Sequence, residues 1–267
     1  MVNLCHMLRV IFIFAILLGS LVVLNGQARL IQGSIENAEE GPVLLASFYG
    51  DRFRVLDSMD TSSGFFYFLL AEDAPPGIYR LIYSDRVDSI RMQNRFVEFI
   101  YNRENLELFI SSTDLGPVIY FENSLENQVY REFMEFELAY EAQLMSLYPR
   151  LDPVQEGEGQ DVTGLYDRIQ SDRESFMDSI TGLYPDLYAV RIMNAFRAPQ
   201  IPGELTHSQR IDTLKICFFD PVTIDDPGLL HAPVYTFKLI DYLSLYQDNT
   251  LTKEEQEAAF IEAVDHI

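Results

Sequence analysis

Cysteine is the residue type in this chain that could support redox chemistry. Cys5 and Cys217 lie far apart, and no C-x-x-C motif occurs anywhere in the sequence. Cys217 sits between Ile216 and Phe218, an apolar setting in which a thiol is usually inert. We therefore predict a buried, unreactive core thiol. Removal of Cys5 with an N-terminal leader would leave no partner for an internal disulfide.

The histidines lack the spacing of a metal site. His207, His231 and His266 are widely separated, and none has Cys, Asp or Glu at ligand spacing. We expect His207 at a helix start and His231 in a loop. The acidic segment 220–228 could offer oxygen ligands to Ca²⁺, but it lacks the alternating ligands and closing glutamate of an EF-hand. Its aspartates are expected to cap helices and to shape turns.

Motifs for other common chemistries are missing from the sequence. It has no dinucleotide or P-loop glycine pattern, no G-x-S-x-G and no H-E-x-x-H. With 41 Asp and Glu residues, pairs of carboxylates arise by chance, so they do not identify a glycosidase. Carbohydrate sites often use tryptophan platforms, and the chain has no Trp; its 15 Tyr and 19 Phe are expected mostly in the core. We predict no catalytic, cofactor-binding or metal site.

The charge of the chain restricts its partners. The formal net charge is −22 and the sequence pI is about 4.4. Such a surface repels phosphate backbones and anionic membranes, which argues against nucleic acid as a partner. Hydrophobic residues make up 48% of the 267 positions, enough for one large core or two modest cores.

The first 28 residues have the pattern of a secretory signal peptide. Arg9 supplies a positive charge, 10–24 is almost continuously apolar, and Gly26 and Ala28 are small residues at a cleavage site. We expect export and a mature chain that begins near Arg29. The alternative is that the apolar segment stays uncleaved and anchors the protein in the membrane.

Residues 29–121 have the pattern of an antiparallel β-sandwich. Short runs rich in aromatic and β-branched residues recur about every ten residues, with turn residues between them. Some runs are apolar on both faces, notably 65–68, and such a strand needs cover on both sides. The predicted strands are 30–36, 43–49, 53–56, 64–70, 78–83, 96–101, 106–110 and 118–121.

Residues 122–267 have helical periodicity instead, so the predicted fold class is α+β. Asn123 is a candidate N-cap with Glu126 three residues later, and the helix that follows should end at Tyr148 and Pro149. Thr252 and Glu255 form a capping box for the last helix. The other predicted helices are 162–181, 185–197, 207–219, 233–247 and 253–265.

Several local motifs follow one another in a characteristic order. They are Ile31-x-Gly33-x-Ile35, Thr61-x-x-Gly64-x-Phe66-x-Phe68, Pro76-Gly77-Ile78-Tyr79, Asn102-Arg103-Glu104 and Asn123-Ser124-Leu125-Glu126-Asn127. This order resembles the N-terminal β domain and helical connector of exported TlpA/ResA-like thiol:disulfide interchange proteins of Gram-negative bacteria. In that family a C-terminal thioredoxin-like domain with C-x-x-C carries the chemistry, and this chain lacks that domain.

The resemblance implies a non-catalytic portion of an envelope oxidoreductase. Its expected role is to position or oligomerise a thioredoxin-like domain, or to bind a substrate polypeptide, in the periplasm. The last helix runs apolar almost to Ile267, from which we expect a truncated protein. The alternatives are a stand-alone scaffold that binds envelope proteins and, more remotely, a carbohydrate-active protein.

Overall fold

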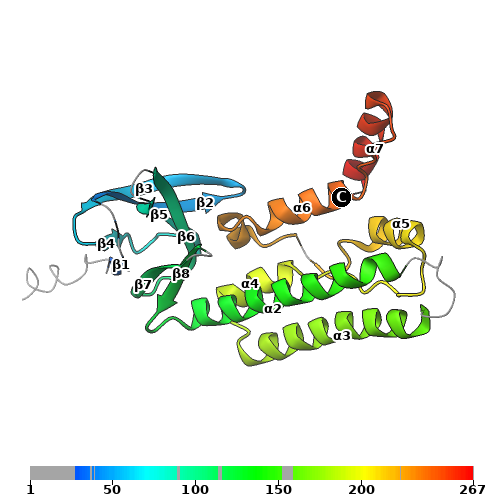
Figure 1. The fold of residues 1–267 in the computed structure, drawn as a ribbon, viewed down its shortest axis with the longest axis horizontal. Helices are drawn as coiled ribbons and strands as arrows, with labels where there is room; N and C mark the ends of the chain where they lie inside the picture. Colours follow the sequence, from blue (N-terminus) through cyan, green and yellow to red (C-terminus); the bar gives the residue numbers. More distant parts are fainter. Residues whose placement is uncertain are drawn as a thin grey trace, which may run out of the picture.

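The computed structural model places strands first and helices second along the chain. The predicted signal peptide, 1–28, lies outside the described residues except for Ala28. In Figure 1 the strands gather at one end of an elongated molecule, and α3, α5 and α7 extend away from them. The structure describes residues 28–36, 38, 40–88, 91–113, 116–151, 159–222 and 224–266.

All eight predicted strands form, with ends that differ by a few residues. They are β1 (Arg29–Ile35), β2 (Gly41–Tyr49), β3 (Arg52–Thr61), β4 (Phe65–Leu70), β5 (Gly77–Asp88), β6 (Arg91–Tyr101), β7 (Leu106–Thr113) and β8 (Gly116–Phe121). The predicted helices also form. They are α2 (Leu125–Leu147), α3 (Gly159–Leu183), α4 (Tyr188–Ala195), α5 (His207–Cys217), α6 (Val234–Ser244) and α7 (Lys253–Asp265), with 3₁₀ turns η1 (Tyr148–Arg150) and η2 (Pro227–His231). The predicted α+β class is confirmed.

The strands form two four-stranded sheets. Sheet A has the order β4-β1-β7-β8, and sheet B has the order β3-β2-β5-β6. The expectation of purely antiparallel pairing is wrong at one place, because β1 and β7 run parallel. These strands are far apart in sequence, so no hairpin forces them to run in opposite directions.

Side chains from both sheets meet in one core, the packing expected of a β-sandwich. Along β1 the buried positions alternate, and Ile31 and Ile35 join Phe66 of sheet A and Leu81 and Phe99 of sheet B in a single buried cluster. Gly33 lies where β1 approaches β7 closely, and a Cβ there would lie 1.9 Å from the carbonyl oxygen of Leu108. This close approach gives a physical reason for the glycine in the first motif.

The helical part packs against one end of sheet B. Phe48, Ile78 and Ile100 of sheet B share a buried cluster with Phe133 of α2 and Tyr188 of α4. The strand part and the helical part therefore pack together, as expected, and the contact is made by sheet B.

A buried polar junction reinforces this packing. The side-chain amide of Asn127 accepts from the backbone N–H of Ile100 and donates to its C=O, at 2.8 Å each, as a neighbouring strand would. Ser124 Oγ accepts from the same amide at 2.8 Å and donates to Glu104 at 2.7 Å. Burial raises the pKa of Glu104, and the hydrogen bond from Ser124 opposes that rise.

The N-terminus of α2 differs from the predicted arrangement. Ser124 rather than Asn123 is the N-cap, and its side chain accepts from the backbone N–H of Asn127. Glu126, only 3% exposed, does not close a capping box; its carboxylate accepts from the N–H groups of Tyr188 and Ala189, at 2.9 and 2.8 Å. A residue of α2 therefore caps α4, where a negative charge is stabilised by the helix dipole.

The last helix begins as predicted. Thr252 and Glu255 form the expected capping box, and a second box, Thr206 with Gln209, begins α5. α7 packs mainly on α6, where Ala263 joins Tyr242 and Tyr246 in a small cluster. Among the described helices, none combines the length and apolar composition that a membrane crossing requires.

Candidate functional site

The outer face of sheet A carries exposed aromatic side chains. Along β4 the side chains alternate, so Phe65, Tyr67 and Leu69 point away from the core and are 50%, 54% and 62% exposed. Phe109 of β7 and Tyr120 of β8 lie on the same face and are also exposed. No element within the described ranges covers this set, Phe65, Tyr67, Leu69, Phe109 and Tyr120, which we call the aromatic face.

Strand register aligns three of these rings in one row. Ser34 of β1 lies opposite Phe65 on one side and Phe109 on the other, and Phe109 lies opposite Tyr120. The rings of Phe109 and Tyr120 stack with their centroids 6.2 Å apart. The small Ser34 side chain leaves a gap between Phe65 and Phe109, so the row is a slot rather than a continuous ridge.

The slot opens into a groove of about 340 Å³ with acidic residues at its margin. Phe65, Phe109 and Tyr120 line this groove together with Glu107 and Glu122. Aromatic faces and carboxylates together favour apolar and cationic side chains of a partner, through stacking, cation–π contact and ion pairing. The groove therefore has the chemistry of a binding surface.

The sequence located these strands but not their exposure. The aromatic residues were expected mostly in the core, and for the aromatic face that expectation is wrong. The sequence did contain a sign of this exposure, the run 65–68, which is apolar on both faces. We expected other elements to cover its second face. The helices pack against one end of sheet B instead, and the second face of β4 faces solvent.

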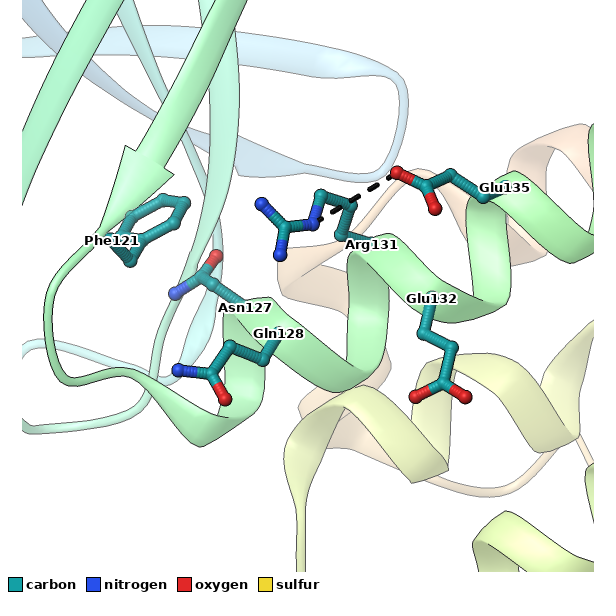
Figure 2. Close-up of a pocket in the computed structure, with 6 residues that line it drawn as sticks. All are labelled: Phe121, Asn127, Gln128, Arg131, Glu132 and Glu135. Atoms are coloured by element: carbon teal, nitrogen blue, oxygen red, sulfur yellow. Dashed lines mark ion pairs between the residues drawn. The ribbon is translucent and has the colours of Figure 1, made fainter.

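A second groove lies where the sheets meet α2, and Figure 2 shows its lining. It has a volume of about 410 Å³ and runs from Phe121 along α2 past Gln128 and Glu132. Arg131 and Glu135 form an exposed ion pair 4.0 Å long at its edge, a type of contact that contributes little to stability. Its one buried polar residue, Asn127, already donates both amide hydrogens to Ile100 and Ser124 and accepts from Ile100, so it has no free N–H donor for a ligand.

The histidines and the acidic segment occupy separate places. His207 begins α5, as expected. His231 is the last residue of the 3₁₀ turn η2 rather than part of a loop, so that expectation is wrong, and His266 follows α7. Asp226 caps η2 by accepting from the N–H of Gly228 at 2.9 Å, as its turn-shaping role predicted. It also pairs with Arg191, whose hydrogen bond lowers the carboxyl pKa. Across the ranges that the structure describes, no three His, Cys, Asp or Glu residues gather as a metal site.

Cys217 is less buried than the sequence suggested. It ends α5 in a partly exposed position, with Sγ donating to the carbonyl oxygen of Thr213 at 3.1 Å. Burial and the nearby Asp220 nevertheless raise its pKa. A raised pKa leaves little thiolate at neutral pH, and the thiolate is the reactive form.

A buried cluster of cations links α2, α3 and α6. Arg173 forms a two-pronged ion pair with Glu137, at 2.7 and 2.8 Å. Lys238, 6% exposed, donates to the carbonyl oxygen of Arg197. Burial, with a further contribution from the charge of Arg173, lowers its pKa to about 8, against the opposing effect of Asp241.

The lowered pKa of Lys238 predicts an unusual pH dependence of stability. At pH 7 both states carry the proton, and the folded state bears the cost of a buried charge. Between pH 8 and about 10 the unfolded chain binds more protons than the folded one, so this cost is relieved as pH rises. Between pH 7 and pH 10 this effect should raise the free energy of unfolding, measured with urea, by about 2 kcal/mol, and Lys238→Met should abolish that rise. The exposed Lys253→Met variant should keep the wild-type dependence, and a Lys238→Met profile parallel to wild type would contradict this account.

The comparisons with known proteins add no relative. The sequence matches no protein-family model and no curated protein.

Proposed function

We propose that this chain is an exported, non-catalytic binding module of a TlpA/ResA-like thiol:disulfide interchange protein, and that it holds substrate polypeptide on the aromatic face. The observation that carries the proposal is the row of Phe65, Phe109 and Tyr120, which stays exposed beside Glu107 and Glu122. The raised pKa of Cys217 supports the non-catalytic part, since a lone thiol of this kind is a poor nucleophile.

The chemistry of the face favours one kind of occupant, an unfolded polypeptide with basic and apolar side chains. A contiguous group of exposed apolar side chains commonly marks an interaction site. The groove is lined by two glutamates and by no lysine or arginine, and the chain as a whole has a net charge of −22. Acidic substrates would be repelled, whereas basic segments would be attracted over a distance of about 10 Å.

Binding of an unfolded basic protein tests this function. The probe is lysozyme that is reduced, carboxamidomethylated and fluorescently labelled. α-Lactalbumin, an acidic protein given the same treatment, is the control. We expect saturable binding of the lysozyme chain by anisotropy, weakened by salt, and at least about tenfold weaker binding of α-lactalbumin. Equal affinity for lysozyme and α-lactalbumin would contradict the role of charge. Binding of an oligosaccharide from a panel, with no binding of either protein, would favour the carbohydrate alternative.

A further inference from the structure

A third hollow lies in the helical part, away from the aromatic face. Tyr148, Tyr166 and Leu245 line it together with Ile211 and Leu214 of α5, and its volume is about 450 Å³. It adjoins a more open hollow of about 760 Å³ between α5 and the α6–α7 connection. The two hollows share His207, Ile211 and Leu245, so they form one continuous groove. Its deeper part is mostly apolar, which suits a hydrocarbon chain or ring.

One charged residue lies at the wall of this apolar hollow. Arg210 of α5 is 5% exposed and donates from Nη1 to the carbonyl oxygen of Leu205. Within the described part of the chain it forms no ion pair, in contrast to the buried Arg173, which is held by Glu137. A guanidinium has five N–H donors, so most of the donors of Arg210 have no acceptor among the described residues.

A buried charge without a counter-charge is costly to the folded state. Such groups are ordinarily paired, because desolvation removes several kcal/mol of hydration energy per ion. Among the described residues, Asp167 accepts from the N–H of Gly203 and Asp212 lines the adjoining hollow, and neither is paired with Arg210. Arg210 thus stands at the pocket as a cation that a bound anion would complete.

Two tyrosines and a helix N-terminus at this pocket also favour an anion. Tyr148 and Tyr166 line the pocket with Arg210, and their hydroxyl groups make no hydrogen bond to a described residue. The pocket also borders the first turn of α5, an 11-residue helix whose N-terminus carries partial positive charge. Burial raises the pKa of Tyr166, so its hydroxyl stays protonated and able to donate.

We propose that this hollow binds a small monocarboxylate with an apolar body. The carboxylate would pair with the guanidinium of Arg210 and accept from Tyr166, and the apolar part would lie along Ile211, Leu214 and Leu245. Arginine suits this role because its planar donors match the two oxygens of a carboxylate. The site lies on α3, α5 and α6–α7, so ligand binding here is separate from polypeptide binding at sheet A.

Calorimetric titration of the purified protein with sodium octanoate tests the proposal. Octanoate provides both parts of the ligand, whereas 1-octanol lacks the charge and acetate lacks the apolar body. We expect octanoate to bind at one site per chain, and each of the other probes to bind at least about tenfold more weakly. Octanol as tight as octanoate would overturn the role of Arg210, and acetate as tight as octanoate would overturn the role of the apolar wall.

Arg210→Met tests whether this arginine holds the ligand. Arg168→Met, on the exposed side of α3, is the control that removes one positive charge elsewhere. We expect the Arg210 variant to lose octanoate binding by roughly tenfold or more while its ligand-free melting temperature stays equal to or above that of wild type. A marked fall in melting temperature would show that Arg210 is structural, and unchanged binding would overturn the proposal. Leu214→Phe, which keeps the charge and fills the hollow, should also abolish binding; retained binding there would contradict the assigned position.

Discussion

Replacing Glu126 with alanine is expected to lower the free energy of unfolding by about 3 to 5 kcal/mol. Its carboxylate accepts three hydrogen bonds, from Tyr188 N–H at 2.9 Å, Ala189 N–H at 2.8 Å and the side-chain amide of Asn102 at 2.6 Å. Alanine would leave two buried backbone donors and the partly buried amide of Asn102 without their acceptor at the junction of the sheets with α2 and α4. Buried donors without acceptors carry the full cost of desolvation.

Urea unfolding followed by circular dichroism measures this effect. Glu126→Gln retains one acceptor oxygen and should lose less stability than the alanine variant. Glu132→Ala, an exposed position on the same helix, should change stability by no more than about 0.5 kcal/mol. Similar values for Glu126→Ala and Glu132→Ala would show that the junction does not hold the two parts together.

Removing the rings of the aromatic face should abolish polypeptide binding without unfolding the protein. The variant combines Phe65→Thr, Tyr67→Thr and Phe109→Thr, since threonine preserves β-propensity on an exposed strand face. We expect affinity for unfolded lysozyme to fall by roughly a hundredfold, since aromatic anchors commonly contribute 1 to 2 kcal/mol or more each. The free energy of unfolding should change by about 1 kcal/mol or less, because these side chains are exposed.

A matched control separates this surface from general hydrophobicity. Leu138, Ile216 and Ile261 are exposed apolar residues on three different helices, and together they offer a similar loss of apolar area. The triple alanine variant at these positions should bind lysozyme as wild type does. Equal loss of affinity in both variants would mean that any exposed apolar residue suffices, and the aromatic face would have no special role.

The elements of this fold were predictable because their signals are local. Strand runs bounded by turns, the apolar stripe of α2 and the box of Thr252 with Glu255 all depend on residues a few positions apart. The parallel pairing of β1 with β7 was not predictable, since no connection or turn between distant strands fixes their direction. The N-cap also shifted by one residue, because Ser124 gains a second partner in Glu104 that only the folded chain supplies.

The candidate sites could not be predicted from the sequence, because the sequence does not show which faces of the fold remain uncovered. The run 65–68 showed that β4 has two apolar faces, but sheet B rather than sheet A received the helices. Glu126 was assigned to its own helix, although its partners are 62 and 63 residues away. Arg210 gave no signal at all, because one arginine in a helix is unremarkable until the fold shows that it is buried and that no described carboxylate pairs with it.

The most direct test of the central claim is photocrosslinking from the aromatic face. Benzoylphenylalanine would replace Phe109, and in a separate protein it would replace Phe237 on α6, which is 50% exposed against 42% for Phe109. After irradiation with unfolded lysozyme, we predict a crosslinked product from position 109 and little or none from position 237. Equal crosslinking from both positions, or crosslinking from 237 alone, would contradict the assignment of the aromatic face as the polypeptide-binding surface.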